Sequence, residues 1–149
     1  MNTEDYVSYP IALALKACGF DEPCRCCYVV DKDTESNIEF TEYASRSKWN
    51  SAKIGGSKYL YKHISAPTLA HAQKWLREKC GLHVVGLPCM DSASDADGQV
   101  CDEWQFWFFD IMQVSTARFL VDGEGRFDSY EQALSEGIKS ALELIKKGD

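Results

Sequence analysis

The stretch that decides the fold is APTLAHAQKWLREKCGL, residues 66–82, because it has the beginning, the apolar stripe and the end of a helix. Pro67 fits the first turn, where a missing N–H leaves no helical hydrogen bond unmade, and Ser65 or Ala66 is the expected cap. The apolar side chains recur at helical spacing: Leu69, Ala72, Leu76 and Cys80. Gly81 suits the left-handed conformation that ends a helix, so the stretch predicts a helix that leads into a strand.

Two further helices are predicted at the ends of the chain. Pro10 lies in the first turn of one, and Gly19 ends it. Ser129 and Gln132 have the spacing of a capping box at the start of the other. Gly137 lies on the apolar face of that last helix, which indicates a close approach to a sheet.

Strands are predicted between these helices. Residues 26–30 and 38–43 have the pattern of a hairpin, and residues 116–121 precede a turn signal at residues 122–125. Residues 104–111 form the most aromatic segment, and both of its faces are apolar, which predicts a central strand. The predicted fold class is α+β, a mostly antiparallel sheet of about four to five strands with three helices in the order α-β-β-α-β-β-(β)-α.

Length and composition predict one globular domain over residues 1–149, with flexible loops at about 44–58 and 88–101. No apolar run approaches the roughly 20 residues that cross a bilayer. The acidic N-terminus lacks the basic and apolar regions of a signal peptide, so we expect a cytoplasmic protein without a membrane partner.

The seven cysteines are an odd number without an export signal, which favours buried reduced thiols over disulfides. Cys24 and Cys27 nevertheless have the C-x-x-C spacing of a metal or redox site. Zinc needs two further ligands, which Cys89, Cys101 or His83 would have to supply, and the sequence has no second C-x-x-C pair. We therefore expect no metal and no other cofactor.

Charge is distributed unevenly along the chain. Residues 43–77 carry seven basic side chains and no acidic one, whereas the whole chain has a net charge of −7. Basic side chains next to aromatic rings are typical of nucleic-acid or anion binding, and a solvated loop explains the same composition. The candidate residues for this site are Arg46, Lys48, Trp49, Lys53, Lys58 and Lys62.

The aromatic segment also suggests a surface for a second protein. Trp104, Phe106 and Phe108 alternate to one side of the strand, and the residues between them point to the other. If helices cover one side only, the remaining side is available to another subunit. The predicted dimer face consists of Trp107, Phe109 and Ile111.

Three segments resemble a known group of proteins. The central helix from Ala66 to Glu78, the end of the first helix from Lys16 to Cys24, and residues 129–134 are similar to segments of short uncharacterised proteins of gut-Bacteroidetes phages and mobile elements. The resemblance covers roughly half of the chain. It implies a compact phage-encoded domain of unknown function and no particular reaction.

These observations leave three functional hypotheses. The first is a non-enzymatic protein-interaction module with an unknown protein partner, or a homodimer through the aromatic face. The second is a nucleic-acid- or phosphate-binding accessory protein that uses residues 44–62. The third is a metal- or thiol-dependent enzyme, although no catalytic residues have a recognisable spacing.

Overall fold

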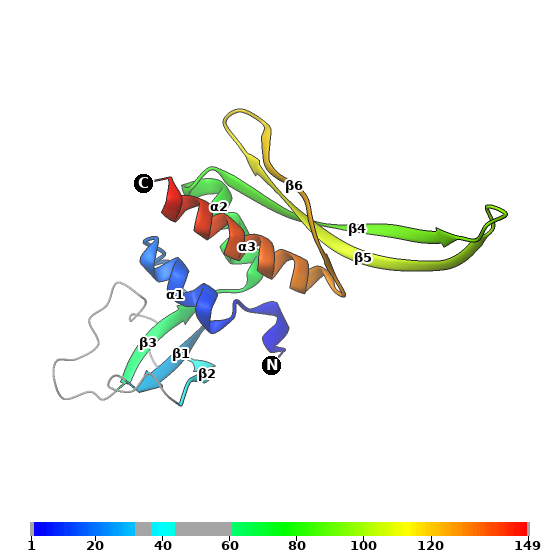
Figure 1. The fold of residues 1–149 in the computed structure, drawn as a ribbon. Coiled ribbons are helices and arrows are strands. Elements are labelled where there is room, and N and C mark those ends of the chain that lie inside the picture. Colours follow the sequence, from blue (N-terminus) through cyan, green and yellow to red (C-terminus); the bar gives the residue numbers. More distant parts are fainter. Residues whose placement is uncertain (1, 32–36, 44–60, 149) are drawn as a thin grey trace. The chain divides into compact units, whose positions relative to one another are not determined.

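The computed structural model describes residues 2–31, 37–43 and 61–148, and it confirms an α+β fold with three helices and antiparallel strands (Figure 1). A short 3-10 helix, η1 (Thr3–Asp5), precedes the three α-helices, which are α1 (Tyr9–Ala17), α2 (Leu69–Lys79) and α3 (Tyr130–Lys147). The strands are β1 (Cys26–Asp31), β2 (Glu39–Glu42), β3 (Tyr61–Ala66), β4 (Leu82–Ser94), β5 (Val100–Gln113) and β6 (Arg118–Phe127).

The strands form two sheets of three strands each, not the single sheet of four to five strands that the sequence predicted. The chain also divides into two compact units, each of which is described by itself. The first unit contains Met1–Ala72 and Ile145–Asp149, and the second unit contains Gln73–Leu144. Each unit has its own sheet, with the strand order β2-β1-β3 in the first unit and β4-β5-β6 in the second.

In the first unit, β1 is the central strand and pairs antiparallel with both neighbours. Tyr28 lies opposite Phe40 on β2 and Ile64 on β3, which confirms the predicted hairpin between β1 and β2. The Tyr28 hydroxyl donates a hydrogen bond of 2.7 Å to the carbonyl oxygen of Val7. This bond joins the central strand to the segment before α1.

The end of α1 has the geometry that its sequence predicted. Gly19 has a φ of 95°, its N–H bonds the carbonyl of Lys16, and the Phe20 N–H bonds the carbonyl of Leu15. This pair of hydrogen bonds is the Schellman motif, in which a left-handed glycine lets the last carbonyls find donors.

The cap of α2 lies two or three residues after the predicted one, which was Ser65 or Ala66. Thr68 is the cap, because its hydroxyl oxygen accepts a hydrogen bond of 3.1 Å from the N–H of His71. Ser65 instead lies in β3, where its hydroxyl is 2.7 Å from the hydroxyl of Tyr43. Because β3 extends to Ala66, both Ser65 and Ala66 belong to the sheet, and α2 begins after them.

In the second unit, residues 88–101 are mostly strand rather than the predicted flexible loop. β4 continues to Ser94 and pairs with β5 along its whole length, which forms the long two-stranded arm in Figure 1. The connection is a tight turn, in which one Asp95 carboxylate oxygen accepts hydrogen bonds from the N–H groups of Asp97 and Gln99. The small and acidic residues here belong to the turn and to the exposed arm. Composition does not reveal the strand, because the pairing with β5 is a non-local interaction.

β6 also continues past its predicted end, through the glycines that were interpreted as a turn. Gly123 and Gly125 have φ values of 68° and 86°, and the register with β5 shifts at several points along the strand. Positive φ values and register shifts are features of β-bulges, which bend a strand without ending it. Gly123 and Gly125 therefore mark β-bulges and not the turn that the sequence predicts.

Helix α3 packs on one face of the second sheet, as Gly137 predicted. A Cβ atom on Gly137 would lie 2.6 Å from Cγ1 of Val84 and 3.1 Å from Cβ of Phe109. Ser129 caps the helix by accepting a hydrogen bond of 3.1 Å from the N–H of Gln132. The glycine thus brings the helix backbone directly onto β4 and β5.

Candidate functional site

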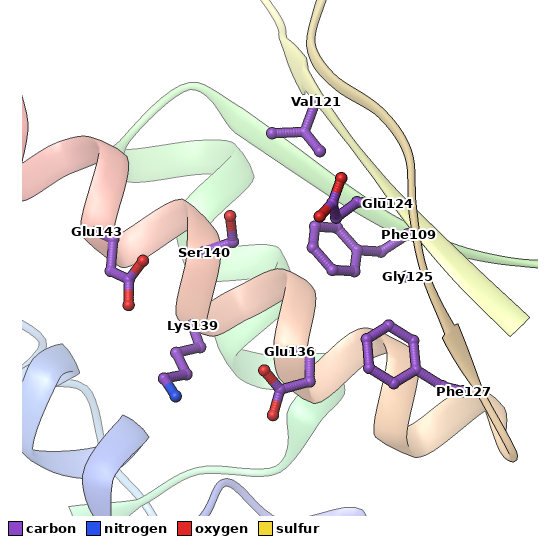
Figure 2. Close-up of a pocket in the computed structure, with 9 residues that line it drawn as sticks. All are labelled: Phe109, Val121, Glu124, Gly125, Phe127, Glu136, Lys139, Ser140 and Glu143. Atoms are coloured by element: carbon purple, nitrogen blue, oxygen red, sulfur yellow. The ribbon is translucent and has the colours of Figure 1, made fainter.

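The second unit has an open groove between α3 and the strands β5 and β6, shown in Figure 2. Its volume is about 500 Å³. The lining residues come from β5, β6 and α3: Phe109, Val121, Glu124, Gly125, Phe127, Glu136, Lys139, Ser140 and Glu143. Pockets that bind small molecules and cofactors have volumes of about 300–1,000 Å³, so the groove is large enough to hold a ligand.

Two aromatic rings form the apolar floor of the groove. The rings of Phe109 and Phe127 stack with centroids 6.1 Å apart and an angle of 24° between their planes. Gly125 makes this arrangement possible, because a Cβ atom there would overlap the ring of Phe127. Val121 adds a third apolar side chain, opposite Ile111 in the strand register.

Acidic side chains dominate the charged rim of the groove. Glu136, Lys139, Ser140 and Glu143 follow one another at helical spacing, so one stripe of α3 faces the groove. Glu124 contributes a further carboxylate from β6, and within the part of the chain that the structure describes Lys139 is the one cation that lines the groove. Glu124, Glu136 and Glu143 are all exposed, which leaves their carboxylates accessible to a bound molecule.

β6 lies at the edge of its sheet next to this groove. Within the described part of the chain, no strand pairs with the outer side of β6. An edge strand presents backbone N–H and C=O groups that a bound segment of another chain is able to pair with. The groove and the strand edge therefore form one continuous candidate surface.

The predicted dimer face needs a correction, because its residues pack inside the second unit. Phe109 and Ile111 are 3% and 0% exposed, and Phe109 lies beneath Gly137 of α3. Trp107 is partly buried and makes an edge-to-face contact with the ring of Tyr130 at 5.5 Å. The chain's own helix thus occupies the face that the sequence assigned to a second subunit.

The opposite face of β5 is the more exposed of the two. Trp104 is 41% exposed, and Phe106 and Phe108 are partly buried with ring centroids 6.5 Å apart. The guanidinium carbon of Arg126 lies 4.6 Å from the centre of the Phe106 ring, in cation–π geometry. Phe119, opposite Met112 in the register, is 53% exposed on this same face.

The C-x-x-C pair lies in the first unit and has the properties of structural thiols. Cys24 and Cys27 are buried, and burial raises the pKa of each to about 12. Thiols with such a pKa are protonated at neutral pH, whereas nucleophilic attack requires the thiolate. Cys89 lies on β4 in the second unit, and the side chain of Cys101 lies outside what the structure describes.

Metal-ligating residues are not gathered at any point in the described ranges. Among the side chains that the structure describes, which do not include those of residues 91, 93, 101 and 102, no three His, Cys, Asp or Glu are placed to hold a metal ion. His83 lies in β4, as expected, with an Nδ1 atom that is buried without a hydrogen-bond partner in the described chain. Burial and the nearby charge of Arg77 lower the pKa of His83.

His71 was expected on a solvated helix face and instead makes specific contacts. Its Nε2 lies 2.8 Å from a carboxylate oxygen of Glu22, and its ring contacts Phe20 edge-to-face at 5.3 Å. All three residues belong to the first unit. This contact joins the segment after α1 to the first turn of α2.

Most of the predicted anion-binding stretch lies outside the described residues. This applies to Arg46, Lys48, Trp49, Lys53 and Lys58. Lys62 is described, and it lies in β3 opposite Val30.

Comparisons with known proteins add no relative to this picture. Neither protein-family models, nor curated proteins, nor solved structures give a match to the chain. In the described part of the chain, no helix combines the length and the apolar character needed to cross a membrane.

Sequence reasoning missed the groove, although half of its lining was visible. The polar stripe of α3, residues 136, 139, 140 and 143, has regular helical spacing and stands beside the apolar stripe. The other wall comes from β6, which was expected to end at Val121. Without that wall, the stripe had only the appearance of a solvated helix face.

Proposed function

We propose that this chain is a protein-interaction module that binds a segment of a partner protein in the groove between α3 and β6. The observation that carries the proposal is the combination of an apolar floor, an acidic rim and an edge strand along one groove. Peptide-binding domains commonly use an edge strand or an apolar groove in this way. Phe127 and Val121, which are partly exposed, supply the apolar contact area above the buried ring of Phe109, and the exposed rim keeps the groove accessible.

The described titratable groups favour binding over catalysis. Cys24 and Cys27 are protonated at neutral pH because burial raises their pKa values to about 12. His83 lies on β4 and is not among the residues that line the groove. The proposal therefore assigns the groove a recognition role, in keeping with the small phage-type proteins that the sequence resembles. The proposed location of the protein is the cytoplasm.

Random-peptide display on the purified protein tests this function. Ser140→Trp is designed to fill the groove, since Ser140 lies on its α3 wall. Gln105→Trp is the matched control, because Gln105 is exposed on β5 and does not line the groove. Thermal unfolding of both variants, followed by circular dichroism, shows whether each retains the fold.

We expect peptides that bind the unsubstituted protein and the Gln105→Trp variant, and that lose most of their binding to Ser140→Trp. If every selected peptide binds the folded Ser140→Trp protein equally well, the groove is not the recognition site and the proposed function is wrong. A selection that enriches no peptide has the same meaning.

A further inference from the structure

We infer that the segment recognised by this groove is cationic, with two Lys or Arg side chains placed on either side of an apolar one. The inference rests on the proposed function and specifies the chemistry of the partner. It follows from the charges of the rim, their spacing along α3 and the position of the aromatic floor.

The rim has an excess of negative charge. Three carboxylates, those of Glu124, Glu136 and Glu143, surround the groove, and Lys139 is the only amine among the described residues that line it. An acidic or neutral segment would leave these carboxylates without counter-charge as it displaced their water. A cationic segment supplies the missing charge, and opposite charges across an interface favour one partner over others.

The spacing of the acids sets a pattern for the partner. Glu136 and Glu143 are two turns apart on α3, a separation of about 10 Å along the helix axis. In an extended segment, residues two positions apart lie on the same side at a distance of about 7 Å. Residues four positions apart lie on that side at about 13 Å. Flexible Lys and Arg side chains bridge the difference, so cations two or four positions apart suit the rim.

The floor of the groove determines what lies between these cations. Figure 2 shows the rings of Phe109 and Phe127 on the sheet side of the groove, across from Glu136 and Ser140 on α3. An apolar side chain between two cations therefore meets the partly exposed side chains of Phe127 and Val121 while the cations reach the rim. The alternation of cationic and apolar residues is the signature that we expect in the partner.

The test uses synthetic peptides chosen from the groove-dependent sequences of the display selection. Each peptide is compared with a counterpart in which every Lys and Arg is replaced by Gln, by fluorescence anisotropy at two salt concentrations. The protein variant Glu136→Gln with Glu143→Gln removes the rim charge. Glu78→Gln with Glu103→Gln removes the same net charge at two exposed sites outside the groove and serves as the matched control.

We expect the Gln counterparts and the rim variant each to weaken binding by about 5- to 30-fold, as two solvent-exposed ion pairs allow. Binding by the matched control should remain within about twofold of the unsubstituted protein at moderate salt, because its charges are remote. Raising the salt concentration should weaken binding to the unsubstituted protein more than binding to the rim variant.

Three results overturn this inference, and they differ in what they mean for the proposed function. If groove-dependent peptides are enriched but are neutral or acidic, the cationic partner is wrong and the groove remains a recognition site. If spermidine binds as tightly as the peptides, with the same dependence on Glu136 and Glu143, the site takes a small cation and not a protein segment. If no groove-dependent peptide exists, both the inference and the proposed function are wrong.

Discussion

The carboxylate of Asp110 on β5 accepts a hydrogen bond of 2.7 Å from the backbone N–H of Gly123 on β6. Asp110 is only 8% exposed, and Gly123 lies where the register between the two strands shifts. A bulge leaves a backbone donor without its regular ladder partner. A side chain of the central strand thus satisfies a backbone donor of the edge strand.

Replacing Asp110 with Ala should therefore lower the free energy of unfolding by about 1–3 kcal/mol, the cost of leaving a partly buried donor unpaired. Urea unfolding at pH 7 measures this effect. Asp122→Ala is the matched control, because Asp122 is exposed on the same bulged strand and its loss changes the net charge equally. Equal midpoints for the two variants would mean that the hydrogen bond adds nothing to stability.

Gly137→Ala should also destabilise the protein, although alanine is the better helix former. The new methyl group would lie 2.6 Å from Cγ1 of Val84, which is closer than packed atoms allow. Overpacking costs about 1–3 kcal/mol and helix propensity returns up to about 1 kcal/mol, so we expect a net loss of roughly 1–2 kcal/mol. Ser135→Ala on the same helix gains propensity without this clash and should be neutral or slightly stabilising. A stabilised Gly137→Ala variant would show that α3 stands further from the sheet.

The thiols of Cys24 and Cys27 should resist alkylation in the folded protein. Both are buried with pKa values raised to about 12, so little thiolate is present at pH 8. Treatment with iodoacetamide, followed by peptide mass spectrometry, should label the partly exposed Cys89 well before either of them. Rapid labelling of Cys24 or Cys27 in the folded state would instead indicate a reactive dithiol.

The same pKa shifts predict a loss of stability at high pH. The unfolded thiols ionise near pH 9, whereas the folded ones stay protonated until about pH 12. The stabilisation is complete below the lower value and is lost as pH rises from 9 toward 12. Urea midpoints should fall across this interval, and Cys27→Ala should make the decline shallower even though the variant is less stable at pH 7. An unchanged slope in the variant would contradict the raised pKa.

His83 should make the protein less stable in mild acid. Its folded pKa lies below the ordinary value of 6.5, because of burial and then the positive charge of Arg77. Above pH 6.5 both the folded and unfolded forms are neutral, and below it the unfolded form binds the proton first, so stability falls as pH decreases. His83→Gln should reduce the drop in urea midpoint between pH 7.5 and pH 5.0. A drop of the same size in the variant would assign the acid sensitivity to other groups.

Helix ends were predictable because their determinants are local. Gly19 and Ser129 form hydrogen bonds with residues three positions away, and Gly81 has the positive φ that its role at a helix end requires. Helix α2 shows the limit of this reasoning. Its cap moved from Ser65 to Thr68 because β3 extends further than expected, and the extent of a strand depends on its partners in the sheet.

The sheets were harder to predict because strand pairing is non-local. Nothing in residues 118–127 indicates that the glycines there are bulges rather than a turn, since the carboxylate that bonds Gly123 comes from β5. The sequence predicts that both faces of β5 are apolar, but it assigns the partner-binding role to the face that is buried. Phe109 and Ile111 are covered by α3 or lie within the core, and Trp104 on the other face is 41% exposed. Which face a helix covers depends on close packing at Gly137, which periodicity alone does not assign to either side.

The irregular backbone of β6 also bears on the solubility of the chain. A long, flat, unpaired strand edge is a template on which identical chains stack into fibrils. Here the positive φ values of Gly123 and Gly125 bend the edge, and charged neighbours such as Asp122 and Arg126 repel or disrupt a regular copy. The bulges and charges that shape β6 for one partner segment therefore also discourage the stacking of identical chains into fibrils.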